Sequence, residues 1–126
     1  MQELHGTDSL RRRAELAQLA DFYGGLLTEK QREALRLHCE EDMSLAEIAG
    51  EMGISRQGVH ELLTRAGSRL NELEDALGMA RRFGRMLPAL EECAGLLRGG
   101  AVAEAAAMLE RLIAEERDAA APLGGD

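Results

Sequence analysis

The stretch SLAEIAGEMGISRQGVHELLTRAGSRL, residues 44–70, constrains the fold of this chain more than any other. Its opening is typical of a helix start, because Ser44 can cap the helix while Glu47, three residues on, completes a capping box. Gly53 follows the last apolar residue, where a left-handed C-terminal residue is favoured. This half therefore predicts a short helix that ends at a sharp turn. Its apolar face consists of Leu45, Ile48, Ala49 and Met52.

The second half of the same stretch predicts a longer helix. Ser55 is a second N-cap, and the apolar positions after it fall on one helical face. Ala49 and Gly53 are small residues four apart, which allows the two helices to cross steeply, and Ile54 can fill the corner. This combination predicts a helix-turn-helix, with an ordinary pair of antiparallel helices as the less specific alternative. The inner face consists of Val59, Leu62, Leu63 and Ala66.

Composition extends the helical prediction to the whole chain. The 126 residues are rich in Ala, Leu, Glu and Arg and include only two prolines and three aromatic residues, which predicts an all-α fold. No run of eighteen apolar residues and no apolar signal segment occur, so we expect no membrane insertion. Cys39 and Cys93 do not form a disulfide framework, which favours a cytoplasmic protein with free thiols.

Two helices are predicted before the helix-turn-helix. The first is capped by Asp8 or Ser9 and runs to about Leu27, and its aromatic residues lie in the apolar face, which favours a core position over base stacking. The second begins after Thr28, with a capping box, and runs to about Glu41. Its basic residues could touch phosphates, but pairing with neighbouring glutamates is the preferred interpretation. These basic residues are Lys30, Arg32 and Arg36.

The part of the chain after residue 78 has a different residue pattern. The long helix is predicted to end at Gly78, and Pro88 is expected to end one helical segment and to begin another. Two glycines after Arg98 stop that segment before a last, alanine-rich helix from Ala101 to about Glu116. The expected parts are a helix-turn-helix domain over 1–78, a C-terminal helical extension over 79–117 and a flexible tail over 118–126.

Charge is distributed unevenly along the chain. The formal net charge is -8 at pH 7, but the segment 55–70 carries three arginines against one glutamate. The first residues of such a helix reach base edges, while its amide groups and its cap can bind a phosphate. This small positive footprint predicts weak non-specific affinity. The candidate nucleic-acid-binding residues are Ser55, Arg56, Gln57, His60 and Arg65.

Signals of catalysis are missing from the sequence. No glycine-rich loop has the lysine or the strand that phosphate binding requires. The histidines do not share a metal-binding spacing with the cysteines, and His38 and Cys39 are adjacent, so their side chains diverge on a helix. No nucleophile has a recognisable base. We therefore expect no enzyme, no cofactor, no catalytic residue and no metal site.

The region from Phe22 to Gly78 resembles the YlxM-type helix-turn-helix proteins, the UPF0122 family, in three motifs: LLTEKQR, SLAEIA and SRQGV. The same region is similar to the DNA-reading C-terminal module of sigma factors. The resemblance therefore implies a winged-helix-like or sigma region 4-like helical bundle. Two positions depart from the family pattern, which tends to have alanine where Gly58 stands and an aromatic residue where His60 stands.

Genes of this family typically lie beside those for the signal recognition particle (SRP) GTPase and its receptor. The resemblance thus implies a regulatory role in the SRP pathway, with binding of DNA or of the SRP RNA as the expected mechanism. The alternative is an interaction protein that binds the SRP GTPase or its receptor and uses the helix-turn-helix as a scaffold. The acidic total and the missing basic arm favour this alternative, and fold alone cannot choose.

A homodimer is the last expectation. Apolar residues of the long helix continue beyond its reading region at alternating three- and four-residue steps, and a second copy could cover them. The seam can also pack on the first helix, and the competing possibility to a dimer is that the C-terminal helices fold back over it within one chain. The seam consists of Leu63, Ala66, Leu70, Leu73 and Leu77.

Overall fold

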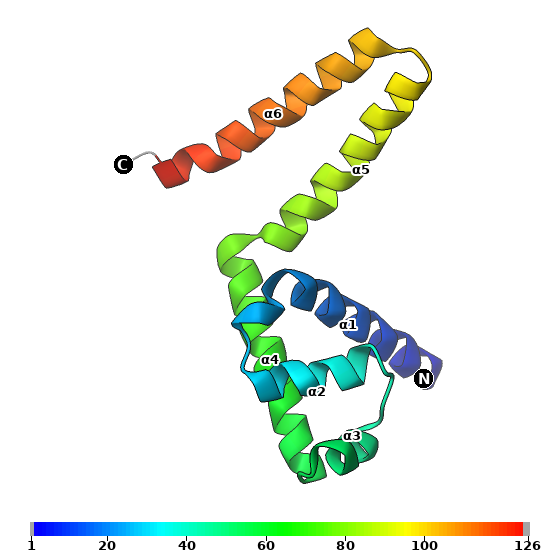
Figure 1. The fold of residues 1–126 in the computed structure, drawn as a ribbon, viewed down its shortest axis with the longest axis vertical. Coiled ribbons are helices and arrows are strands. Elements are labelled where there is room, and N and C mark those ends of the chain that lie inside the picture. Colours follow the sequence, from blue (N-terminus) through cyan, green and yellow to red (C-terminus); the bar gives the residue numbers. More distant parts are fainter. Residues whose placement is uncertain (1, 125–126) are drawn as a thin grey trace. The chain divides into compact units, whose positions relative to one another are not determined.

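The computed structural model describes the backbone of residues 2–124 and the side chains of residues 10–119 (Figure 1). The described residues form six α-helices and one 3-10 turn and contain no strand, which confirms the predicted all-α class. The chain divides into two compact units, 1–80 and 81–126. The elements are α1 (Gln2–Tyr23), η1 (Gly24–Leu26), α2 (Glu29–Cys39), α3 (Leu45–Met52), α4 (Arg56–Leu77), α5 (Met79–Arg98) and α6 (Val102–Gly124).

Both predicted capping boxes are present. At the start of α2, the Gln31 amide donates to the Thr28 hydroxyl and the Thr28 amide donates to the Gln31 side chain, each at 3.1 Å. At the start of α3, the Glu47 amide donates to Ser44 Oγ at 3.1 Å, and the Ser44 amide donates to Glu47 Oε1 at 2.9 Å. Each box satisfies two amide groups that the helix itself leaves without partners.

The turn between α3 and α4 also follows the prediction. Gly53 adopts φ 69° and ψ 33°, a left-handed conformation that costs a residue with a side chain more than it costs glycine. Ser55 then caps α4 by accepting a hydrogen bond from the Gly58 amide at 2.9 Å. The long helix ends at Gly78, which is left-handed with φ 64°. The helix-turn-helix therefore consists of α3 and the first turns of α4.

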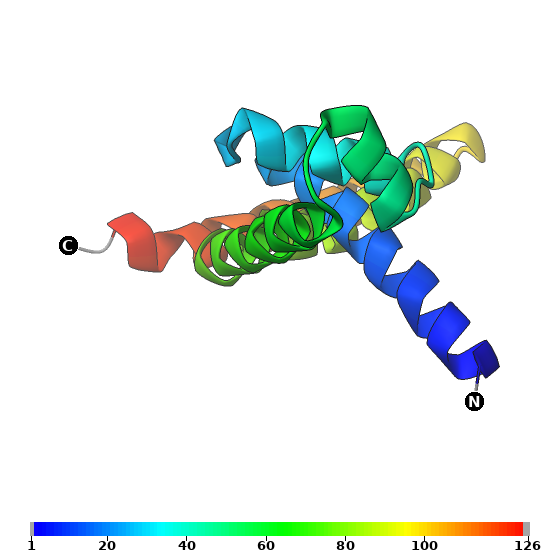
Figure 2. The same cartoon turned by 90° about the horizontal axis from the view of Figure 1, so that it is seen from below.

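In unit 1, α4 is the central helix, and α1, α2 and α3 each pack against it (Figures 1 and 2). One apolar cluster joins α1, α2 and α4, and a second joins α2, α3 and α4. Burial of these side chains provides the main stabilisation of the unit. The first cluster consists of Tyr23, Leu27, Leu35, Ala66, Leu70 and Leu73. The second consists of Leu37, Ile48 and Val59.

Most of the apolar seam of α4 is covered within unit 1, by the first helix, which was one of the expected partners, and by α2. Ala66 and Leu70 are fully buried and Leu73 is 9% exposed, in one cluster with Tyr23 and Leu35. Ala66, Leu70 and Leu73 are thus covered by α1 and α2, with Leu27 in the segment between them, whereas Leu77 at the end of the seam is 52% exposed. Most of the apolar surface that the expected dimer would bury is therefore already covered within the chain, and a dimer through this seam is not supported.

The first helix begins earlier than predicted. It starts at Gln2, so Asp8 and Ser9 lie inside α1 rather than at its cap. Their side chains lie outside the described set. A residue of capping type marks a start only where the preceding residues leave the helix, and residues 2–7 contain no proline that would require this.

The predicted break at Pro88 is also wrong, since α5 continues from Met79 to Arg98 with Pro88 in its interior. Proline lacks the amide that would donate to the carbonyl of Gly84, four residues earlier. Both residues are exposed, so water can take that place. The last helix extends to Gly124 and not to about Glu116 as predicted, so helix covers 118–124. The flexibility expected for 118–126 stays a prediction, and residues 125 and 126 lie outside the described residues.

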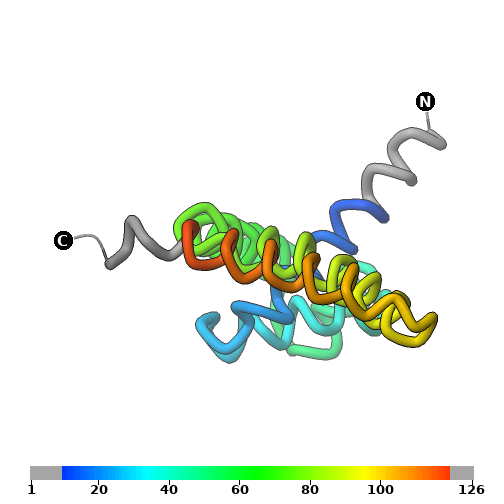
Figure 3. The backbone as a smooth tube through the Cα atoms, turned by 90° about the horizontal axis from the view of Figure 1, so that it is seen from above, coloured from blue at the N-terminus to red at the C-terminus, as the bar shows by residue number. Residues whose placement is uncertain are grey.

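Unit 2 consists of the antiparallel helices α5 and α6 (Figures 1 and 3). Gly100, with φ 85°, makes the turn between them, where two glycines had predicted a stop. Arg82 Nε lies 3.6 Å from Glu116 Oε2 and ties the two helices together at the far end from the turn. The division at Ala80 lies close to the boundary expected at residue 78, and separate folding of the two parts stays a prediction.

Candidate nucleic-acid interface

The start of α4 presents the chemical groups that an anion would need. Ser55 is extended, with φ -74° and ψ 158°, and its hydroxyl oxygen accepts from Gly58. The first bond inside the helix runs from the Val59 amide to the Ser55 carbonyl at 3.0 Å. The amides of Arg56 and Gln57 therefore precede the helical ladder and lie at the positive end of the helix dipole. Ser55 keeps only its O–H for donation to a ligand.

The five candidate residues do not all share one face of α4. Gln57 and His60 are exposed and three residues apart, so they form a stripe on one side of α4; Gln57 is nearly opposite the buried Val59, and His60 lies about 100° from Val59, toward α1. Arg56 and Arg65 are nine residues apart, which at 3.6 residues per turn puts them roughly 180° apart around the helix and about 13 Å apart along it. The two arginines therefore flank the central stripe and cannot contact the same base.

Arg65 is partly engaged by a neighbour. Its guanidinium lies 3.5 Å from Glu61 Oε1, and the two side chains are 72% and 65% exposed. An ion pair this exposed is weak and screened by salt, so it leaves Arg65 available to a phosphate. Thr64, which sequence reasoning did not select, is exposed and four residues after His60 on the same stripe. That i, i+4 spacing was the signal that could have identified it.

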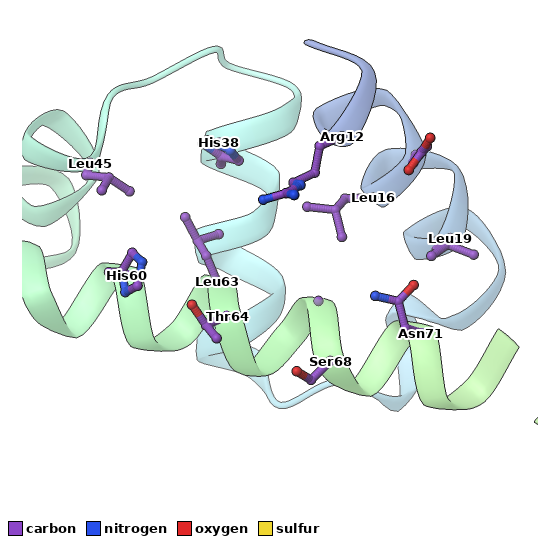
Figure 4. A pocket seen from close by; sticks show the side chains of 12 residues that line it. Arg12, Leu16, Leu19, His38, Leu45, His60, Leu63, Thr64, Ser68 and Asn71 are labelled. Carbon is purple, nitrogen blue, oxygen red and sulfur yellow. The ribbon is translucent and has the colours of Figure 1, made fainter. Parts of the chain in front are cut away.

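The central stripe of α4 continues into a groove of about 510 Å³ between α1 and α4, with contributions from α2 and α3 (Figure 4). Sequence reasoning missed this groove, because it depends on how α1 packs against α4. Apolar side chains line part of it, namely Leu16, Leu19, Leu45 and Leu63. Polar side chains line the rest, among them Arg12, His38, His60, Thr64, Ser68 and Asn71.

Charge within the groove comes from few residues. Desolvation, and next the positive charge of Arg13, hold the pKa of His38 below its usual value of 6.5, so this imidazole is neutral at neutral pH. Arg13 forms an ion pair with Asp42. Arg12 and Glu15 are the charged side chains that line the groove. In Figure 4 the guanidinium of Arg12 extends over the groove, beneath His38 and toward the side of Leu63 and His60.

Other kinds of site receive no support from the part of the chain that the structure describes. No group of three His, Cys, Asp or Glu side chains there is placed to hold a metal ion. Cys39 is half-buried, and desolvation raises its pKa, which makes its thiol less reactive. Cys93 is buried, and both cysteines are free. None of the described helices is long and apolar enough to span a membrane.

Comparison with known proteins adds a family to this geometry. Residues 10–94 match the sequence profile of UPF0122, described as "Putative helix-turn-helix protein, YlxM / p13 like". A UPF0122 protein of Symbiobacterium thermophilum is 51% identical over 77 residues, which cover 61% of this chain and 72% of that protein. A UPF0122 protein of Desulforamulus reducens is 41% identical over 93 residues, which cover 74% of this chain and 80% of that protein. A UPF0122 protein of Geobacillus kaustophilus is 38% identical over 96 residues, which cover 75% of this chain and 87% of that protein.

Proposed function

The chain belongs to the UPF0122 family of YlxM/p13-like helix-turn-helix proteins, and on this premise we propose that it is a non-enzymatic regulatory protein that binds nucleic acid through the start of α4. One observation carries the proposal. In a chain of net charge -8, the segment 55–70, which follows the helix-turn-helix corner, carries three arginines against one glutamate, whereas the rest of α4 carries three acidic residues. The three arginines are exposed, so their charge has no structural task in the core.

Each candidate residue has a distinct role in this proposal. Gln57 and His60, at the centre of the stripe, contact base edges, where an amide can make two hydrogen bonds to adenine. Arg56 and Arg65 lie on opposite sides of that stripe and contact phosphates of the two strands that border a groove. Ser55 and the first amides of α4 hold one further phosphate. DNA is the expected target, because the helix enters a major groove best.

Selection of binding sequences tests the base-reading role. Repeated selection from a pool of random-sequence DNA duplexes should return a shared motif with the wild-type protein. With Gln57→Ala, the preference at one position should disappear, because the contact that reads that base is gone. Glu51→Ala, an exposed change on α3, serves as the control and should return the wild-type motif. The absence of any enriched motif for the wild type would contradict base reading.

A second candidate function rests on the acidic total of the chain. With net charge -8, most of the surface repels nucleic acid, and the helix-turn-helix could instead serve as a scaffold for a protein. We propose for this case a cytoplasmic role in the SRP pathway through the SRP GTPase or its receptor. Capture of partners from a native lysate with and without nuclease separates the two functions. Nuclease-resistant capture of the GTPase supports the scaffold, whereas nuclease-sensitive capture supports nucleic-acid binding.

The homodimer expected from the sequence is proposed again, but through unit 2. Among its described side chains only Cys93 and Ala105 are fully buried, while five large apolar side chains are 41–50% exposed. An apolar groove of about 370 Å³ lies between α5 and α6. Complete burial of an exposed apolar side chain contributes about 1.5–3 kcal/mol, and covering the exposed half of each of these contributes about half of that; a second hairpin would complete a four-helix bundle. The five are Phe83, Leu87, Leu90, Leu97 and Ile113.

Sedimentation equilibrium tests this dimer. The wild-type protein should have the mass of two chains at micromolar concentration, and Ile113→Glu, which puts a charge into the apolar groove, should reduce the mass to that of one chain. Val102→Glu is the matched control, because Val102 is 61% exposed and lies beside the turn, outside the groove. A single-chain mass for the wild-type protein would rule out the dimer.

A further inference from the structure

We propose that the groove between α1 and α4 binds an unpaired nucleotide, with its phosphate at Arg12 and its base over the leucines of the groove. This inference deepens the proposed function and rests on it in part. It assigns to the groove a nucleotide that is either free or part of a nucleic-acid chain. The two sources share a phosphate attached to a planar, polar-edged base, and the experiment below distinguishes them.

The size of the groove sets the first limit on its occupant. Its volume of about 510 Å³ lies within the range of small-molecule sites, which is roughly 300–1,000 Å³. A stretch of duplex cannot enter a cavity of this size, because its bases are stacked and paired. A single base that has left its stack can enter, and side-chain pockets commonly recognise unpaired bases in this way. The occupant is therefore a nucleotide without a pairing partner.

The positive end of the groove is the part that selects a phosphate. Arg12 is exposed and extends its guanidinium over the groove, whereas the neighbouring Arg13 is held by Asp42. His38 is neutral at neutral pH, because burial lowers its pKa, so it adds no second charge. A guanidinium binds phosphate oxygens in pairs. Glu15 also lines the groove and would repel a phosphate, which restricts the phosphate to the side of Arg12.

The remaining walls suit the base and the sugar. Leu16 and Leu63 provide an apolar surface for the flat face of a base. Thr64, Ser68 and Asn71 are spaced by four and three residues, so they lie in one row about 10 Å long on α4. Two hydroxyls and an amide supply both donors and acceptors, which the edge of a base and a ribose hydroxyl require. A phosphate site alone would explain neither this row nor the leucines.

The groove also continues the candidate nucleic-acid interface. His60 belongs to the exposed stripe at the start of α4 and lines the groove as well, and Thr64 follows it one turn later. A strand that leaves the start of α4 along the helix would therefore reach the groove without crossing other elements of unit 1. This continuity favours a nucleotide that belongs to a chain over a free one.

The test compares three probes on the full-length protein: AMP, a short single-stranded oligoadenylate and a blunt duplex of mixed sequence. Calorimetry measures AMP, and fluorescence anisotropy measures the two labelled nucleic acids. Arg12→Gln should weaken AMP and oligoadenylate binding about tenfold, because a charge-assisted contact is lost. Arg11→Gln is the matched control: it removes the same charge from an exposed neighbour outside the groove and should change binding less than twofold.

A second variant tests occupancy of the groove rather than its charge. Ser68→Phe places a ring in the groove from an exposed position, where it should not disturb the core, and should abolish binding of both AMP and the oligoadenylate. Circular dichroism checks that each variant keeps its helix content. Binding of oligoadenylate with no binding of AMP would assign the groove to a nucleic-acid chain, and comparable affinity for both would assign it to a free nucleotide.

Three results would overturn the inference. The first is that neither AMP nor the oligoadenylate binds. The second is that Arg11→Gln and Arg12→Gln lose the same affinity. The third is that Ser68→Phe binds both probes as the wild type does. Duplex binding separates this failure from failure of the proposed function. If the duplex binds and its binding depends on Arg56, while AMP and the oligoadenylate do not bind, the groove has no nucleotide role and the proposed function stands. If Arg56→Ala has no effect while Arg12→Gln does, the groove stands alone.

Discussion

Replacement of Gly58 by alanine tests whether the Ser55 cap at the start of α4 leaves room for a Cβ atom at position 58. A helical glycine costs about 0.5–1 kcal/mol relative to alanine, so the substitution should stabilise unit 1. The added Cβ would lie 3.2 Å from Ser55 Oγ, which is closer than usual, and 3.6 Å from Ile54 Cδ1, which is an ordinary contact. Ser55 is exposed and its hydrogen bond to Gly58 is 2.9 Å long, so the hydroxyl can withdraw by a few tenths of an ångström and remain a cap.

The expected net effect is a stabilisation of about 0.5 kcal/mol, the propensity gain less a small cost at the cap. Two glycines provide controls. Gly50→Ala in α3 meets nothing within 4 Å and should show the full gain, whereas Gly53→Ala should lose about 1–2 kcal/mol because its φ is 69°.

Urea titration followed by tyrosine fluorescence measures these differences in unit 1. Tyr23 is the single tyrosine of a chain without tryptophan, and the Tyr23 ring is buried in the first cluster. The reasoning about the cap would be refuted if Gly58→Ala lost stability while Gly50→Ala gained it. In that case the Ser55 hydroxyl could not move away from the added methyl group.

Three further predictions concern stability. Ala49→Leu should overpack the steep crossing beside Ile48 and cost about 1–3 kcal/mol, and an unchanged urea midpoint would argue against that crossing. The pKa of His38 in the folded state lies below 6.5, so the unfolded chain takes up a proton first as the pH falls. The stability that depends on neutral His38 should therefore be fully present above about pH 6.5 and decrease below it. His38→Gln should make the thermal midpoint less dependent on pH between pH 7.5 and 5.5. A chain truncated after residue 80 should keep cooperative unfolding by tyrosine fluorescence, since both apolar clusters of unit 1 lie before that point, and a non-cooperative transition would show that the helices beyond it are required.

The parts of the fold that could be predicted depend on neighbours within one helical turn. The capping boxes at Thr28 and Ser44 each involve residues three apart, and Gly53 needs only its own backbone conformation. Such signals act before any tertiary contact forms. The two helices of the helix-turn-helix could therefore be placed to within a residue from sequence alone.

The errors concern solvent and long-range packing. Pro88 stays inside a helix because the carbonyl it leaves without a donor is exposed, which a sequence pattern does not reveal. Leu70 is buried by α1 and α2, and the periodicity of α4 showed that it needed cover without showing which element supplies it. The groove beside Arg12 could not be predicted either, because its two walls are almost fifty residues apart in the chain.

The most direct test of the central claim is the salt dependence of nucleic-acid binding by variants of α4. Labelled DNA duplexes of mixed sequence are titrated at several salt concentrations with wild type, with the double variant Arg56→Ala and Arg65→Ala, and with a control pair. The control, Arg85→Ala with Arg98→Ala, removes the same charge from exposed positions of α5. Each lost phosphate contact should lower the slope of log affinity against log salt by about 0.9.

The account predicts that the α4 double variant binds more weakly and with a slope reduced by about 2, while the control pair retains the wild-type slope. Equal slopes for the wild type and the α4 variant, or equal losses for the α4 and α5 variants, would contradict the claim that the start of α4 is the nucleic-acid-binding surface.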